Sequence, residues 1–166
     1  KEPYYALVPH NLAVMVREDG QLMTAMYDPS AGQMDARDVG WSRQITDGTF
    51  ESVCVIPTDF GHQVWVAVKR LINGVERTYI EYITDDFFMD SAMYTTAGAP
   101  PTETLTNLDH LEGKTLDILV DGAVHPRETV VNGTITLNWP GTNIVVGLHY
   151  RPKIVTMPFT DGNPAG

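Results

Sequence analysis

The sequence predicts an all-β fold, and three observations carry this prediction. Short turn signals divide the 166-residue chain into strand-sized segments. Asn-Gly and Asp-Gly pairs favour two-residue type I′ turns, because both central residues of such a turn need positive φ. The segments between the pairs alternate apolar with polar residues or are rich in β-branched residues, and no helical stripe stands out. The turn signals are Asp19-Gly20, Asp47-Gly48, Asn73-Gly74, Asp121-Gly122, Asn132-Gly133, Pro140-Gly141 and Asp161-Gly162.

Residues 1–100 are expected to form an antiparallel hairpin sheet module. An alternating segment from Leu12 to Val16 precedes Asp19-Gly20, and a strand ended by Pro57 follows Asp47-Gly48. The clearest hairpin is the segment QVWVAVKRLI, the turn Asn73-Gly74 and the return VERTYIEYI. The first three turn signals recur every 26 to 28 residues, a spacing that leaves a propeller-like arrangement open.

A second all-β unit is expected over residues 104–158. Pro100-Pro101 cannot join a sheet ladder, so a boundary is placed in the segment 95–103. Beyond it, strands of five to seven residues spaced about ten apart are typical of a small β-barrel or sandwich, and of these we expect the barrel. A last strand is expected at residues 153–157, and it pairs either with the barrel or, if the barrel is an insertion, with the first sheet.

Composition excludes several classes of function. The chain is 43% hydrophobic, which suits a packed core, and has no apolar run long enough to span a membrane. Cys54 is the one cysteine, so no internal disulfide and no thiolate metal site can form, and we expect it to be a small buried hydrophobe. The net charge of −10 argues against static binding to nucleic acid. A start without Met indicates either a processed chain or a fragment of a longer protein, and with the Gly- and Pro-containing end we expect the fragment.

The sequence contains no recognisable metal-binding or catalytic motif. Asp85, Asp86 and Asp90 cluster around two phenylalanines, but their spacing matches no calcium loop, so a solvated or capping loop is the expectation. The five histidines form no metal-binding motif, and no serine lies in a nucleophile elbow. We therefore expect neither an enzyme nor a bound cofactor or metal.

The three tryptophans leave two interpretations open. Trp41, Trp65 and Trp139 fall in different predicted strands. Aromatic residues of this kind either pack in a core or protein interface, or form a platform on which a sugar stacks. The sequence alone favours core or interface packing, because the three make no stripe.

Several segments resemble one family of bacteriophage virion proteins. They are REDGQLMTAMYDP (17–29), GWSRQITDGTFESVCVIP (40–57), VWVAVKRLINGVERTYIEYI (64–83), NLDHLEGKTLDILVDGAVHP (107–126) and the stretch from VNGTITL to IVVGLHY (131–150). In this order they are similar to the nozzle, or tail-tube, proteins of short-tailed bacteriophages. The resemblance spans residues 12–157. This sequence departs from the family pattern at Asn107, where the family usually has glycine.

The resemblance implies a structural protein of the virion tail, assembled in the host cytoplasm. Some members of the family carry a small barrel similar to the FCCH domain of ubiquitin-activating enzymes, without their chemistry. Members assemble with other tail proteins as rings around a channel for DNA ejection, so no catalytic residues carry over. An acidic lumen would let DNA pass without binding, and the candidates for it are Asp85, Asp86, Asp90, Asp109 and Glu112.

The sequence leaves two other functions open. A carbohydrate-binding or receptor-recognition module of a tail tip would use Trp41, Trp65 and Trp139 as stacking surfaces. A glycan hydrolase would need a cleft with two carboxylates roughly 5 to 9 Å apart. The sequence offers many acidic residues and singles out no such pair.

Overall fold

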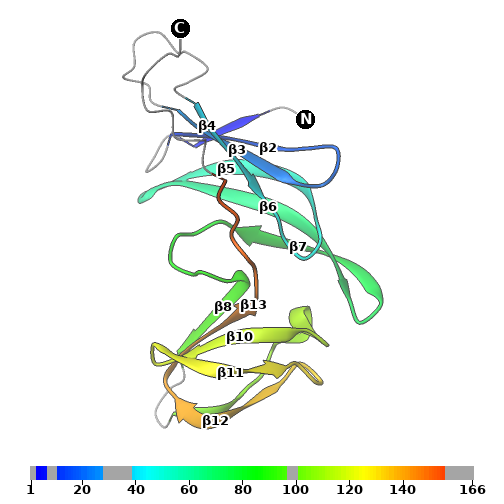
Figure 1. Cartoon of the computed structure of the whole chain (residues 1–166), viewed down its shortest axis with the longest axis vertical. Coiled ribbons are helices and arrows are strands. Elements are labelled where there is room, and N and C mark those ends of the chain that lie inside the picture. The colour runs from blue at the N-terminus through cyan, green and yellow to red at the C-terminus, as the bar shows by residue number, and fades with distance from the viewer. Residues whose placement is uncertain (1–2, 7–10, 28–38, 97–100, 156–166) are drawn as a thin grey trace, which may run out of the picture.

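The computed structural model describes residues 3–6, 11–27, 39–96 and 101–155, and its regular structure is almost entirely β-strand. The all-β prediction is confirmed. In Figure 1 the strands before residue 83 occupy one end of an elongated molecule, and the strands after residue 89 occupy the other. Apart from strands, one short 3-10 turn, η2 (Asp109–Leu111), forms within the described residues.

Two antiparallel sheets form the N-terminal end. Sheet A has the order β1-β2-β3-β4, and sheet B has the order β5-β6-β7. Sheet A consists of β1 (Tyr4–Ala6), β2 (Leu12–Val16), β3 (Leu22–Tyr27) and β4 (Val39–Gln44). Sheet B consists of β5 (Thr49–Thr58), β6 (Gly61–Ile72) and β7 (Val75–Tyr82).

The two N-terminal sheets share one apolar core. Val14, Val16 and Leu22 of sheet A pack with Phe50, Val53, Val64, Val66 and Val68 of sheet B. Burying one such side chain stabilises the fold by roughly 1.5–3 kcal/mol. Sheets packed over a common core form a sandwich-like arrangement rather than radiating propeller blades.

Strand β6 follows a two-residue period from Val64 to Ile72. Val64, Val66, Val68, Arg70 and Ile72 are buried on its inner face. The residues between them, from Trp65 to Leu71, lie on the outer face, because successive side chains of a strand point to opposite sides. One charged residue, Arg70, therefore lies in a row of buried aliphatic residues.

The C-terminal end contains sheet C, with the order β11-β10-β13-β8, and sheet D, with the order β12-β9. The strands are β8 (Asp90–Thr96), β9 (Thr102–Leu105), β10 (Thr115–Val120), β11 (Ala123–Thr129), β12 (Ile135–Gly141) and β13 (Asn143–Leu148). Both sheets contribute to a core that includes Leu108, Leu116, Ile118, Leu137 and Ile144. The ladders of the described residues form two sheets and do not close into a barrel. Strand β8 precedes the proline pair, yet it pairs with β13.

Three of the predicted turns have the backbone of a type I′ hairpin turn. The φ angles are 49° and 75° at Asn73-Gly74, 50° and 82° at Asp121-Gly122, and 54° and 66° at Asn132-Gly133. All six angles are positive, as this turn requires. The first two turns join β6 to β7 and β10 to β11 as hairpins.

Other sequence expectations need correction. Asp47-Gly48 is a turn but not a hairpin, because β4 before it belongs to sheet A and β5 after it to sheet B. Pro140-Gly141 lies within β12. Pro57 does not end its strand, since β5 is an edge strand, where a missing N–H is tolerated. Asp161-Gly162 lies outside the described residues.

The expected last strand is also wrong over the part that the structure describes. Residues 153–155 carry no strand. In Figure 1 the chain after β13 instead runs back along the molecule toward the N-terminal sheets. The remaining residues of the expected strand, 156 and 157, lie outside the described part of the chain.

Candidate functional sites

The five acidic residues proposed for a lumen do not come together. Asp85 and Asp86 are exposed between β7 and β8, where the Thr84 hydroxyl donates a 2.8 Å hydrogen bond to Asp86. Asp90 begins β8 and faces Arg70. Asp109 begins η2 and Glu112 directly follows it, on the C-terminal end of the molecule. The structure thus divides the five among a loop, an ion-pair network and a cleft wall.

A buried arginine joins the two ends of the molecule. Arg70 is 1% exposed, and its Nε and Nη2 donate hydrogen bonds of 2.9 and 2.8 Å to the two carboxylate oxygens of Glu81 on β7. Its Nη1 donates to the Asp47 carbonyl at 2.8 Å and lies 3.4 Å from Oδ2 of Asp90. A two-pronged contact of this kind fixes the guanidinium plane.

Asp90 links this network to sheet C. Its carboxylate accepts hydrogen bonds from the Thr46 hydroxyl at 3.0 and 2.8 Å and from the Asp47 backbone N–H at 3.1 Å. Thr46 and Asp47 belong to the connection between sheets A and B, whereas Asp90 opens a strand of sheet C. The Arg70 network therefore connects sheet B, sheet C and the segment between β4 and β5 through hydrogen bonds and ion pairs rather than through strand pairing.

A glycine brings the Asp47 carbonyl close to Arg70. Gly48 has φ of 145°, and a Cβ added there would lie 2.3 Å from the Lys69 carbonyl oxygen. No larger residue fits against that backbone. Burial disfavours the positive charge of Arg70, but the hydrogen bonds and charges of Glu81 and Asp90 prevail and raise its pKa. The guanidinium is therefore a fixed charge in this network.

The three tryptophans lie in three different sheets. Trp41 is on β4 of sheet A and is 58% exposed. Trp65 is on β6 of sheet B, with its ring 5.3 Å from that of Tyr82. Trp139 is on β12 of sheet D, and its ring lies 4.4 Å from that of His125. The structure does not bring them together as one stacking platform.

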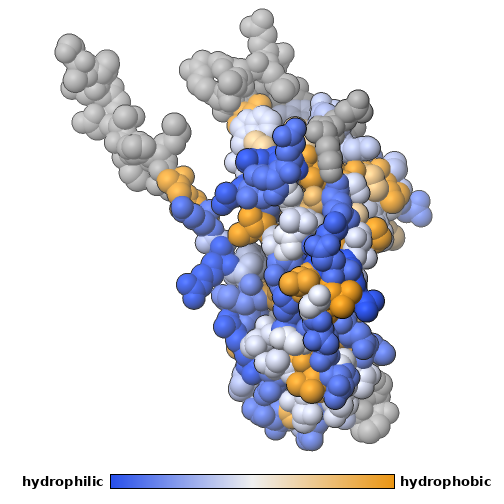
Figure 2. Space-filling model, turned by 90° about the vertical axis from the view of Figure 1, so that its right-hand side faces the viewer, coloured by the Kyte–Doolittle hydropathy of each residue, from blue (hydrophilic) through white to orange (hydrophobic). Residues whose placement is uncertain are grey.

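The outer face of sheet B carries an exposed group of mainly apolar side chains. Two cross-strand rows make it: Cys54, Trp65 and Tyr82, and Ser52, Ala67 and Ile80. Ile80 is 68% exposed and Tyr82 47%. Cys54 is exposed, which corrects the expectation that it is buried. Figure 2, which views the side where the β6–β7 hairpin projects in Figure 1, shows apolar groups there in separate patches between polar ones.

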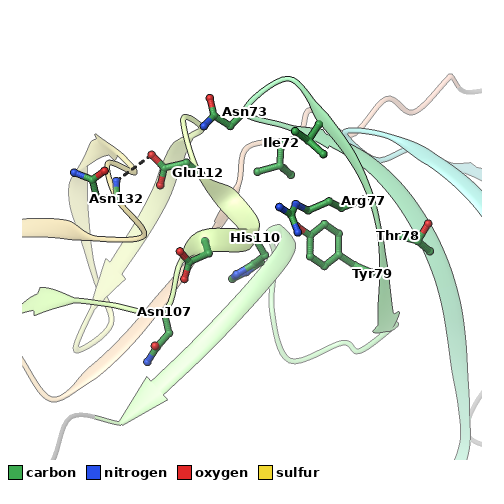
Figure 3. A pocket seen from close by; sticks show the side chains of 11 residues that line it. Ile72, Asn73, Arg77, Thr78, Tyr79, Asn107, His110, Glu112 and Asn132 are labelled. Carbon is green, nitrogen blue, oxygen red and sulfur yellow. Dashed lines mark hydrogen bonds between the residues drawn. The ribbon is translucent and has the colours of Figure 1, made fainter.

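A cleft of about 1040 Å³ separates the β6–β7 hairpin from the loops around η2. Figure 3 shows Arg77 and Tyr79 pointing from β7 toward His110, with Asn73 above them and Asn107 and Asn132 on the opposite wall. The rings of Tyr79 and His110 meet edge to face, with centroids 6.3 Å apart. No pattern in the sequence predicts that Arg77 lies opposite His110, because the two residues belong to different ends of the molecule.

Burial beside β7 lowers the pKa of His110 from its ordinary value of 6.5. Nearby positive charge on Arg70 acts in the same direction, whereas Glu81 and Asp109 oppose the shift. The neutral imidazole is therefore favoured in the folded chain. At Asp117, burial works against the charge, but hydrogen bonds from His149 and Arg127 prevail and lower the pKa of the carboxyl.

The lowered pKa values of His110 and Asp117 predict that the free energy of unfolding falls in two steps as the pH is lowered. Below pH 6.5 the unfolded chain protonates His110 while the folded chain resists, so the free energy of unfolding decreases as pH falls. A second loss begins below pH 3.8, where unfolded Asp117 takes up a proton that the folded carboxylate does not. Urea unfolding between about pH 5 and pH 8 will show a smaller pH dependence for His110→Gln than for the unsubstituted chain. Equal slopes would refute the role of His110.

No group of three or more His, Cys, Asp or Glu side chains within the described residues could hold a metal ion. Over the same part of the chain, no helix is long and apolar enough to cross a bilayer. No protein-family model and no curated protein matches the chain.

Proposed function

We propose that this chain is a structural subunit of a bacteriophage tail, of the nozzle or tail-tube kind that its sequence resembles. Copies of it and other tail proteins would form a ring-shaped channel for DNA ejection, assembled in the host cytoplasm and carried in the virion. In this proposal the chain is not an enzyme and needs no cofactor.

The observation that carries the proposal is the exposed outer face of sheet B. The inner faces of β5 and β6 are buried against sheet A, and on the other side of the sheet Ile80 and Tyr82 of β7 lie beside Trp65. Exposed aromatic and aliphatic side chains on a rigid element are typical of the buried centre of a protein–protein interface. A ring subunit needs such a surface for contact with its neighbours.

The charge distribution supports passage of DNA without binding. The chain has a net charge of −10, and many of its basic side chains are paired with acids. The pairs are Arg17–Asp19, Lys69–Glu51, Arg70–Glu81, Lys114–Asp47 and Arg127–Asp117. A paired cation has less charge to offer a phosphate, and counterion release from DNA requires clustered free cations.

The proposal predicts that the chain is found in phage tails. Purified virions of the encoding phage, labelled with gold-conjugated antibody raised against this chain, will show the gold at the tail in negative-stain images. A matched antibody against a host cytoplasmic protein gives the background. Virions without label, from lysates in which the chain stays in the soluble fraction, would refute the proposal.

A further inference from the structure

The cleft between β7 and η2 has walls that are held in place from both sides. On the C-terminal wall, the Glu112 carboxylate accepts hydrogen bonds from the backbone N–H groups of Asn132 and Gly133 at 3.0 and 2.7 Å. The Leu108 N–H donates to the Gly133 carbonyl at 2.9 Å, and the Leu108 side chain is fully buried. These contacts fix the turn that carries Asn132 against the loop that carries Asn107.

The two walls are also fixed relative to each other. Arg70 and Asp90 join β6 to β8 outside the cleft lining, and the rings of Tyr79 and His110 contact each other between its two walls. Lys114, which follows η2, forms an ion pair of 2.5 Å with Asp47. A ligand entering the cleft therefore meets a largely preformed site, which lowers the entropic cost of binding.

Polar groups with unused hydrogen-bonding capacity surround the cleft. No hydrogen bond or ion pair connects the side chains of Asn73, Asn107, Asn132 and Arg77 to another residue in the described part of the chain. Each carboxamide offers donors and an acceptor, and the guanidinium offers five donors. The Tyr79 ring adds an apolar surface beside them.

The composition of the lining selects the class of ligand. An apolar molecule would leave these polar groups without partners, which costs free energy. Excess positive charge for an anion is lacking, because the lining that contains Arg77 also contains the carboxylates of Asp109 and Glu112. Neutral hydroxyl groups, each both donor and acceptor, match the mixed carboxamides, and the apolar C–H face of a sugar ring matches Tyr79.

We infer that this cleft binds a neutral oligosaccharide, through Arg77, Asn107 and the ring of Tyr79. This site contains none of the three tryptophans and does not depend on the tail role proposed above. A structural subunit with such a cleft would contact surface glycans of a cell or hold a sugar-bearing partner.

The test uses the intact chain and an array of neutral bacterial surface oligosaccharides. The oligosaccharide with the strongest signal is then titrated calorimetrically into the unsubstituted chain, Arg77→Gln and Asn107→Gly. Glycine suits position 107, where φ is 65°. Loss of a charged or bidentate contact will weaken binding about tenfold in each variant. Arg43→Gln and Trp41→Ala, both on β4 outside the cleft, will bind as the unsubstituted chain does.

Several results would overturn the inference. A silent array is one, and undiminished binding by both cleft variants is another. Loss of binding in Trp41→Ala alone would move the site to β4. Titration of inorganic phosphate that saturates the cleft, with no sugar bound, would assign the site to an anion instead. Circular dichroism spectra that match the unsubstituted chain confirm that each variant is folded, and none of these results bears on whether the chain is found in virions.

Discussion

Replacing Arg70 with methionine is expected to lower the free energy of unfolding by about 3–5 kcal/mol. The substitution keeps an apolar stem in the buried row of β6 but leaves Glu81 and Asp90 without their cation. The side chains of these two acids are 23% and 18% exposed, so water reaches them in part. The expected loss therefore lies toward the lower end of this range. Urea unfolding followed by tryptophan fluorescence measures it.

Arg77→Met is the matched control for this prediction. Arg77 lies directly across from Arg70 in the β6–β7 ladder, but it is exposed. Its substitution will change the free energy of unfolding by no more than about 0.5 kcal/mol. If Arg70→Met changes the free energy of unfolding as little as Arg77→Met does, the Arg70 network does not stabilise the contact between sheets B and C.

A charge-removing variant separates the missing ion pair from the missing side chain. Arg70→Met combined with Glu81→Gln and Asp90→Asn no longer leaves two carboxylates beside an apolar residue. We expect this triple variant to recover about 1 kcal/mol or more relative to Arg70→Met. A triple variant less stable than Arg70→Met would show that the carboxylates of Glu81 and Asp90 stabilise the contact between sheets B and C even without the arginine.

The hairpins could be predicted from the sequence because their signals are local. Asn73-Gly74 and Asp121-Gly122 each need only their own positive φ angles and two flanking strands. The same reasoning failed at Asp47-Gly48, where the turn is real but the strands on either side belong to different sheets. Sheet membership depends on contacts between distant segments, and no dipeptide specifies those.

The Arg70 network was visible in the sequence only in part. A charged residue in the inward register of a valine-rich strand indicates a buried charge that needs partners. Its partners Glu81 and Asp90 lie 11 and 20 residues away along the chain, the second in another sheet. Nothing in the local pattern distinguishes Asp90 from the neighbouring Asp85 and Asp86, which are exposed.

The cleft and the outer face of sheet B also depend on contacts between distant segments, which local sequence patterns do not specify. Asn107 and Asn132 are separated in the sequence from Arg77, and only the arrangement of the two ends brings them together. The apolar segment SVCVI predicts a buried Cys54. Strand alternation instead places Val53 in the core and Cys54 on the outer face, so a run of apolar residues does not mean that both faces are covered.

A charged substitution on the outer face of sheet B is expected to abolish self-association of the chain. Ile80 is 68% exposed and lies beside Ala67 in the ladder. A lysine there is compatible with the folded monomer, because the side chain points to solvent. At the centre of an interface it would bury an unpaired charge, which prevents close contact between copies. We therefore expect Ile80→Lys to abolish assembly while leaving the monomer folded.

The molar mass of the intact chain in solution, measured by light scattering during size exclusion, tests this account most directly. We predict that the unsubstituted chain forms a closed oligomer and that Ile80→Lys is a folded monomer. Val124→Lys, which places the same charge at a residue 80% exposed on β11, will assemble like the unsubstituted chain. A monomeric unsubstituted chain, or assembly of Ile80→Lys equal to that of Val124→Lys, would contradict the proposal that sheet B joins the subunits of a tail ring.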